Sequence, residues 1–213
     1  LLTQRLGALA PGLISPDQVS AVKGRRVSDC LILIRDSVQF QLVRGLPLAL
    51  LSLDFEKAYD RLSHQFLWAV LGRMGVPSVF VSWIRMLYGA SSSRVLFNGW
   101  LSRGFRIRSG VRQGCPMSPL LFVCAIECLS RMIAGEPSIT GVHVPGSDGQ
   151  STKVQLYMDD VTLMCTSHAS VSRALDKVTV YCQDSGSKIN GHKSQCMLYG
   201  GLGGRIPAQP SGR

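Results

Sequence analysis

The sequence predicts a fold of the α+β class. Residues 48–55, LALLSLDF, are almost continuously apolar, which is typical of a central strand buried on both faces. Two further apolar runs, residues 153–158 and 161–165, flank a pair of aspartates as the strands of a tight hairpin do. Apolar residues at helical spacing fill much of the chain between these strands. Both strands and helices are therefore expected to contribute to the core.

Composition limits the class of protein and its partners. The chain has 213 residues, 46% of them hydrophobic, which suffices for one large domain or a domain with a subdomain. Its formal net charge of +10 predicts a polyanionic partner. Nucleic acid fits better than a membrane, because no segment approaches about twenty uninterrupted apolar residues. A generally basic, solubilising surface is the alternative.

Cysteine usage and the N-terminus favour an intracellular protein, in the cytoplasm or the nucleus. The seven cysteines include no Cys-x-x-Cys pair, and no histidine stands at zinc-finger spacing, so reduced core thiols are expected. Cys124 and Cys128 share a helix face, where packing is favoured over metal binding. The chain begins at Leu1 without a secretory leader, which also fits a fragment of a longer protein.

The N-terminal region ends in a basic cluster. Residues 1–24 have an irregular pattern with proline and glycine breakers, although Ser15-Pro16 is able to open a short helix. Ser28 is expected to cap a helix toward Val43, with helical spacing at Leu31, Ile34, Arg35 and Val38. A phosphate fits the cluster before this helix, unless that cluster is a solvated loop; it comprises Lys23, Arg25 and Arg26.

The central strand ends in a carboxylate, that of Asp54. A charge at the end of a buried strand must be paired, protonated or bound to metal, because leaving it bare costs several kcal/mol. Two helices are expected next, over residues 63–74 and 78–88, and their apolar stripes are assigned to the core.

A basic hairpin is predicted after these helices. Residues 92–97 and 101–108 alternate like strands around Asn98-Gly99, a strong hairpin signal. Four arginines occur here without an acid, and they predict contact with a nucleic acid backbone: Arg103, Arg106, Arg108 and Arg112. An exposed basic edge strand is the alternative.

Residues 110–119, GVRQGCPMSP, form a glycine- and proline-rich turn that feeds an apolar helix over residues 120–133. So little side-chain bulk lets backbone approach a ligand, and Gln113 offers a donor and acceptors there. An ordinary strand-to-helix connection is the alternative.

The last third of the chain surrounds the two aspartates. A short strand is expected over residues 140–144, a surface turn over 145–150, a helix over 170–182 and a last strand over 194–199. A polar loop precedes that strand and contains Lys188, Asn190, His192 and Lys193. Residues 201–213 have the composition of a flexible tail.

Asp159-Asp160 is poor turn chemistry for a hairpin tip, which favours Asn-Gly or Asp-Gly. Two ionised carboxylates repel each other unless they share a cation, so a divalent metal is one explanation and a solvated surface turn the other. Asp54 also lies at a predicted strand end. Adjacent strands would bring these carboxylates together, as two-metal phosphoryl transfer requires.

Four motifs occur in the order and spacing found in the reverse transcriptases of non-LTR (LINE-like) retrotransposons: LSLDFEKAYD, GVRQGCPMSPLLF, LYMDDVTL and SGSKINGHKS. The segment SPDQVSAVKGRRVSDCLILIRD is similar to their fingers region, so the resemblance extends to about Tyr199. It implies a right-hand polymerase fold with fingers and palm over residues 1–200, the palm being an antiparallel sheet backed by helices. The thumb and endonuclease domains of a full-length element are not expected within this chain.

The resemblance also implies a set of site residues. Two Mg²⁺ ions, with Mn²⁺ as a possible substitute, would be bound by Asp54, Asp159, Asp160 and the backbone carbonyl of Phe55. Tyr59 matches the aromatic gate that excludes a ribose 2′-OH.

Three further positions that contact the nucleotide have matches in this chain. Gln113 matches the residue packed against the incoming nucleotide and the templating base. Arg25 or Arg26 resembles the cation that grips the triphosphate, and Lys193 the lysine that protonates pyrophosphate, with Lys188 as the weaker candidate.

The implied reaction adds a deoxynucleotide to the 3′-OH of a DNA primer on an RNA template. One alternative is a catalytically silent remnant of a truncated retroelement, acting at most as a basic RNA- or DNA-binding module. Another is an RNA-templated RNA polymerase, against which Tyr59 argues.

Overall fold

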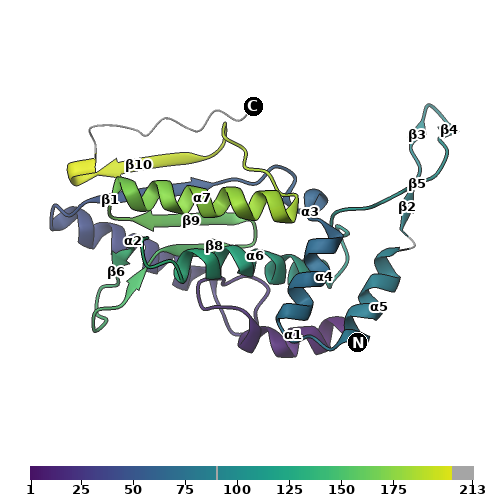
Figure 1. Cartoon of the computed structure of the whole chain (residues 1–213), viewed down its shortest axis with the longest axis horizontal. Helices are drawn as coiled ribbons and strands as arrows, with labels where there is room; N and C mark the ends of the chain where they lie inside the picture. The colour runs from purple at the N-terminus through teal and green to yellow at the C-terminus, as the bar shows by residue number, and fades with distance from the viewer. Residues whose placement is uncertain (90, 203–213) are drawn as a thin grey trace.

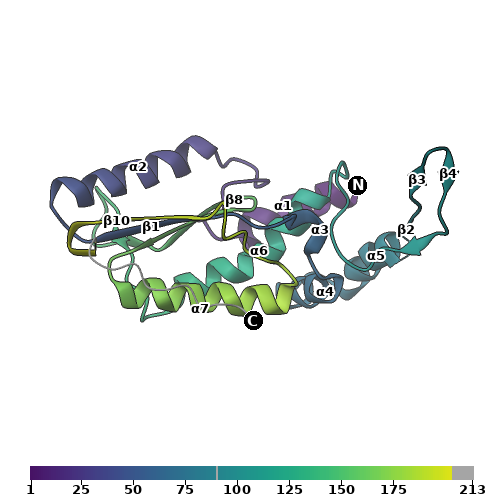
Figure 2. The same ribbon diagram turned by 90° about the horizontal axis from the view of Figure 1, so that it is seen from above.

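A four-stranded antiparallel sheet forms the centre of the protein, in the strand order β10-β1-β9-β8. The computed structural model describes residues 1–89 and 91–202. The strands are β1 (Leu48–Leu53), β8 (Val154–Tyr157), β9 (Asp160–Cys165) and β10 (Gln195–Tyr199). Helices α6 (Ser118–Ala134) and α7 (His168–Ser185) cover one face, and α2 (Val27–Val43) covers the other (Figure 2). An antiparallel sheet backed by helices is thus confirmed.

The predicted aspartate hairpin is present. Strand β8 pairs with β9 in a register that sets Tyr157 opposite Asp160, so Met158 and Asp159 form the connecting loop. The second carboxylate therefore belongs to β9, one residue earlier than the predicted strand start. Strand β1 lies beside β9 with Leu53 opposite Val161, which brings the residue after β1 to the hairpin end of the sheet.

The first 24 residues differ from the irregular pattern that we predicted, because residues 2–13 form helix α1 (Leu2–Leu13) with Pro11 inside it. Pro11 lies in the last turn and removes one helical hydrogen bond, and burial of Leu6 and Ala10 in the core offsets this cost. The Ser15-Pro16 segment starts no helix and belongs to a loop that turns at Pro16 and Asp17.

Helix α2 also departs from its prediction at one end. It begins at Val27 with Arg26 in the N-cap position, so Ser28 lies inside the helix and is not its cap. Leu31 was expected on the core face but is 59% exposed, whereas Cys30 is buried.

Three helices follow β1: α3 (Ala58–Arg61), α4 (His64–Arg73) and α5 (Ser78–Gly89). The two longer ones confirm the predicted helical runs. Ser63 caps α4 by accepting a hydrogen bond from the N–H of Phe66, and Leu67 and Leu71 are fully buried.

An arm projects from the body of the protein after α5 (Figure 1). It contains β2 (Ser92–Ser93), β3 (Leu96–Phe97), β4 (Trp100–Leu101) and β5 (Phe105–Arg106). The predicted turn is confirmed, with φ of +46° at Asn98 and +84° at Gly99. The two predicted long strands are broken into these short pairs.

A second small hairpin follows α6, formed by β6 (Val142–His143) and β7 (Ser151–Thr152). It corresponds to the strand predicted over residues 140–144 and the turn predicted over 145–150. Leu202 lies in a 3₁₀ helix, η1 (Gly200–Leu202), and is buried, so the start of the predicted tail is part of the core. The rest of that prediction, residues 203–213, lies outside the described residues.

The seven cysteines are all unpaired, as predicted. The expectation that they are core residues holds for the buried Cys30, Cys124 and Cys165, but Cys196 is exposed on the edge strand β10. Within the described residues, we find no helix that is both long and apolar enough to span a membrane.

Candidate active site

Asp54 and Asp159 line one cleft of about 480 Å³ at the hairpin end of the sheet. Asp54 directly follows β1, and Asp159 stands in the β8–β9 turn, so antiparallel pairing of β1 with β9 brings them together. Both are partly exposed. Residues from two distant motifs of the sequence therefore face a common space, together with Lys193 and Asn190.

The charges of the other two carboxylates affect the pKa of Asp160. Burial raises the pKa of Asp160, and the negative charges of Asp159 and then Asp54 raise it further. Across residues 1–89 and 91–202, no three His, Cys, Asp or Glu side chains gather into a ready-made metal cluster. The pair that shares the cleft nevertheless fits a divalent cation, since concentrated carboxylate oxygens are its preferred ligands.

The loop that carries Lys193 is fixed to the end of β1. The N–H of Asn190 donates to the carbonyl of Asp54 at 2.8 Å. The N–H of Asp54 donates to Oγ of Ser194 at 3.1 Å. These two bonds hold the exposed Lys193 beside the aspartates.

The other lysine of that loop is paired with a carboxylate at the rim of the cleft. Lys188 Nζ lies 3.1 Å from a carboxylate oxygen of Glu56, which lines the cleft, whereas Lys188 does not. Lys193 lines the cleft, as does Lys57, so the geometry favours Lys193 over Lys188.

Tyr59 bridges the hairpin and helix α6. Its ring stacks on that of Phe122, with centroids 4.9 Å apart and planes at 8°. Its hydroxyl donates to Sδ of Met158 at 3.5 Å. Burial raises the pKa of Tyr59, and the charge of Asp159 raises it further. The predicted gate residue is thus close to one of the predicted metal ligands.

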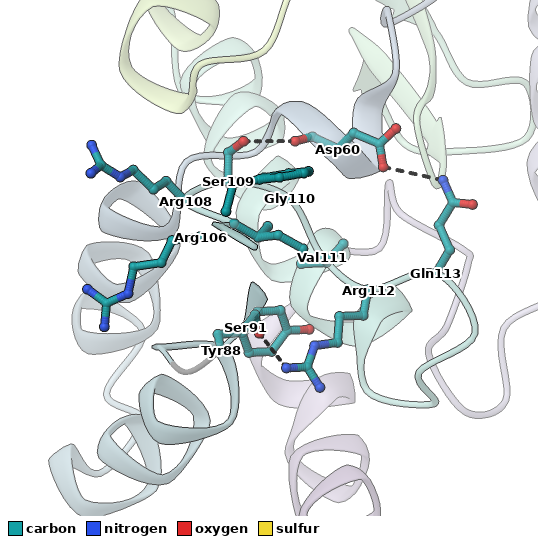
Figure 3. Close-up of a pocket in the computed structure, with 12 residues that line it drawn as sticks. Asp60, Tyr88, Ser91, Arg106, Arg108, Ser109, Gly110, Val111, Arg112 and Gln113 are labelled. Carbon is teal, nitrogen blue, oxygen red and sulfur yellow. Dashed lines mark hydrogen bonds between the residues drawn. The ribbon is translucent and has the colours of Figure 1, made fainter. Parts of the chain in front are cut away.

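Hydrogen bonds attach the glycine-rich turn to α3, and Figure 3 shows those that Ser109 and Gln113 make with Asp60. Ser109 Oγ donates to the carbonyl of Asp60 at 3.1 Å, and the N–H of Val111 donates to the carbonyl of Tyr59 at 2.7 Å. Gln113 Nε2 lies 3.4 Å from Oδ1 of Asp60. Gln113 and Tyr59 consequently line one pocket, next to the start of α6.

Arg112 does not join the other arginines of the predicted basic surface. Its guanidinium donates to the carbonyl of Leu87 at 2.7 Å and to Oγ of Ser91, and it lies 5.5 Å over the ring of Tyr88. Arg112 is exposed, but its guanidinium is bonded to the C-terminal end of α5 and to Ser91. The other members of the set are also exposed: Arg103, Arg106 and Arg108. Figure 3 shows Arg106 and Arg108 extending away from Arg112.

The two arginines before α2 have different surroundings. The Arg25 guanidinium donates to the carbonyls of Ile14 at 2.7 Å, of Gln18 at 2.6 Å and of Ser15. It is therefore committed to the loop before α2. Arg26 is exposed at the N-terminal end of that helix, where free backbone N–H groups also favour an anion.

Sequence reasoning missed Gln18, which is fully buried and contacts the backbone of Met158. The poor turn chemistry predicted at Asp159-Asp160 indicated that something other than turn propensity holds the turn. It did not indicate which one, because the two segments lie far apart in the chain.

Comparisons with known proteins identify the family and the fold. The family described as reverse transcriptase (RNA-dependent DNA polymerase) matches residues 1–211. A transposon TX1 uncharacterized 149 kDa protein of Xenopus laevis is 36% identical over 94% of this chain. A retrovirus-related Pol polyprotein from the type-2 retrotransposable element R2DM of Drosophila melanogaster is 31% identical over 67% of it. The chain spans only 15% and 13% of these two relatives.

Solved structures share the fold at low identity. A truncated apo telomerase of Candida tropicalis superimposes with a TM-score of 0.66 at 15% identity, over 92% of this chain and 39% of its own. A telomerase of Candida albicans with a fragment of telomeric RNA gives 0.65 at 15% identity, over 92% and 33%. The fold is thus the fingers and palm of a polymerase, and the chain belongs to the reverse transcriptase (RNA-dependent DNA polymerase) family, with relatives among non-LTR retrotransposons.

Proposed function

We propose that this chain catalyses RNA-directed DNA synthesis, in which a deoxynucleotide is added to the 3′-OH of a primer paired with an RNA template. The observation that carries the proposal is the shared cleft of Asp54, Asp159 and Lys193. Membership of the family supports the reaction class. Extension of a primer on an RNA template tests it. An intracellular site of action, in the cytoplasm or the nucleus, is part of the same proposal.

The metal site follows from the carboxylates of the cleft. Asp54, Asp159 and Asp160, with the backbone carbonyl of Phe55, would hold two Mg²⁺ ions, for which Mn²⁺ is a substitute. When bound, these ions activate the attacking oxygen and neutralise charge on the leaving group.

The chain's own residues would orient the reactants and move one proton. The primer 3′-OH gives up its proton to water, and its oxygen forms a bond to the α-phosphorus as the bond to pyrophosphate breaks. Lys193 gives its proton to the departing pyrophosphate oxygen. Arg26 binds the triphosphate, since Arg25 is committed to backbone carbonyls. Gln113 contacts the base pair being formed.

Tyr59→Val is expected to admit ribonucleotides. The stacked ring occupies the space beside the hairpin turn, so replacing it with a smaller side chain leaves room for a 2′-OH. The ratio of deoxynucleotide to ribonucleotide incorporation should fall about tenfold or more, measured as kcat/KM on one template. Tyr59→Phe keeps the ring and is the matched control. An unchanged ratio in Tyr59→Val would remove the gate role, and a wild-type preference for ribonucleotides would indicate an RNA polymerase.

The arm is proposed to contact the backbone of the primer–template. The double variant Arg106→Gln, Arg108→Gln should weaken binding and reduce the slope of log K against log salt by about 0.7 to 0.9 per lost contact. Arg112→Gln should leave the slope unchanged and lower thermal stability, because its guanidinium bonds Leu87 and Ser91. Fluorescence anisotropy across a salt series measures both. Equal slopes in the double variant and the wild type would contradict an arm contact.

A further inference from the structure

The turn that carries Asp159 has a backbone conformation that its sequence does not favour. Met158 has φ of +55°. Glycine adopts this left-handed region readily and asparagine and aspartate do so occasionally, but other residues seldom do. It is followed by Asp159 and then by the first residue of β9. Some contact from elsewhere in the fold must therefore stabilise the turn.

Gln18 makes that contact. Its side chain is 0% exposed, and its amide holds both backbone polar groups of Met158. Nε2 donates to the Met158 carbonyl at 3.3 Å, and Oε1 accepts from the Met158 N–H at 3.3 Å. Oε1 also accepts from the N–H of Ser20 at 2.9 Å. Buried amide groups satisfied in this way fix one local geometry.

The loop that presents Gln18 is itself fixed to the sheet. The N–H of Leu156 donates to the carbonyl of Asp17 at 2.8 Å, and the N–H of Val19 donates to the carbonyl of Leu156 at 3.2 Å. The loop thus pairs with the outer edge of β8. The Arg25 guanidinium binds the Gln18 carbonyl at 2.6 Å from the other side.

We propose that Gln18 is a positioning residue, which holds the Met158 backbone and so sets the Asp159 carboxylate opposite Asp54. Arg25 supports this role by ordering the loop from which Gln18 extends. The inference rests on the proposed function for its catalytic consequence, but not for its structural one. Because Gln18 is fully buried, it acts through the turn rather than by contact with a substrate.

The first test follows the turn itself. Gln18→Leu removes the three amide hydrogen bonds with little change in volume. The N–H of Met158 should then exchange with solvent about tenfold faster or more, measured by NMR on the labelled chain. Gln41→Leu is the control, because Gln41 is equally buried on α2 and contacts Pro47 rather than the hairpin. Gln18→Asn, whose amide is one methylene shorter, serves if the leucine variant does not fold.

The second test follows catalysis. In Gln18→Leu, kcat for single-nucleotide incorporation should fall about ten- to a hundredfold, because small displacements of a reacting group are costly. KM for the deoxynucleotide should change little, and the Mg²⁺ concentration for half-maximal rate should rise. Gln41→Leu should keep the wild-type kcat at a temperature where both variants are folded.

Two results would overturn the inference. One is equal Met158 exchange rates in Gln18→Leu and in the wild type or in the Gln41→Leu control. The other is faster exchange in Gln18→Leu with an unchanged kcat. If the wild-type chain incorporates no nucleotide, the proposed function fails by itself, and the exchange comparison still decides whether Gln18 holds the turn.

Discussion

Asp159→Asn and Asp54→Asn are each expected to reduce nucleotide incorporation at least about a hundred- to a thousandfold. Both side chains line the same cleft, and an amide loses the negative charge with which a carboxylate holds a divalent cation. The fold should survive, because both residues are partly exposed and the two side chains are nearly isosteric. Single-turnover extension of a labelled primer on RNA at saturating Mg²⁺ measures the loss.

Asp148→Asn is the matched control for this loss. Asp148 is an exposed carboxylate in the turn between β6 and β7, away from the cleft, so its variant should extend the primer at the wild-type rate. Asp160→Asn should be less severe than Asp159→Asn, since Asp160 is not among the residues that line the cleft. Wild-type rates in Asp54→Asn or Asp159→Asn would refute the assignment of these carboxylates as metal ligands.

Gly110→Ala is expected to lower the free energy of unfolding by about 2 to 5 kcal/mol, the combined cost of a strained backbone and overpacking. Gly110 has φ of +86°, and a Cβ atom would lie 2.7 Å from the carbonyl oxygen of Asp60 and 2.9 Å from that of Tyr59. The N–H of Gly110 also donates to the carbonyl of Leu62 at 2.7 Å. The turn cannot move away from the new Cβ atom without breaking this hydrogen bond. Urea unfolding followed by circular dichroism measures the change.

Gly114→Ala separates the two causes of this loss. Gly114 has φ of +82° in the same turn, but a Cβ atom there would meet nothing within 4 Å. Gly114→Ala should therefore lower the free energy of unfolding only by the backbone strain of about 1 to 2 kcal/mol. If the two variants are equally stable, the close approach of the turn to α3 does not contribute to stability, and the contact that sets Gln113 beside Tyr59 is weaker than the structure indicates.

The parts of the fold that local chemistry specifies were predicted from the sequence. The Asn98-Gly99 turn forms because both residues accept positive φ, and β1 is recognisable because a central strand is apolar on both faces. The prediction that Asp54 and Asp159 lie close together was correct, because each stands at the end of a recognisable strand. These features depend on residues that are neighbours in the chain.

The parts that long-range contacts decide were not predicted. Helix α1 was missed because Pro11 and Gly12 are local helix breakers, and burial of Leu6 and Ala10 against the core outweighs them. Arg25 and Arg112 are charged in the sequence like their neighbours, yet the fold binds both guanidinium groups to backbone carbonyls. Their roles became visible only once the carbonyls of distant segments were placed around them.

The most direct test of catalysis by this chain is extension of oligo(dT) on poly(rA) with dTTP and Mg²⁺. We predict a ladder of longer primers that disappears with EDTA and reappears when excess Mg²⁺ or Mn²⁺ is restored. The protein should also bind this primer–template with a strong dependence on salt, as expected for a chain with a net charge of +10. If the protein binds this primer–template in a salt-sensitive way but does not extend the primer, the account is contradicted. The chain would then be a silent nucleic-acid-binding remnant.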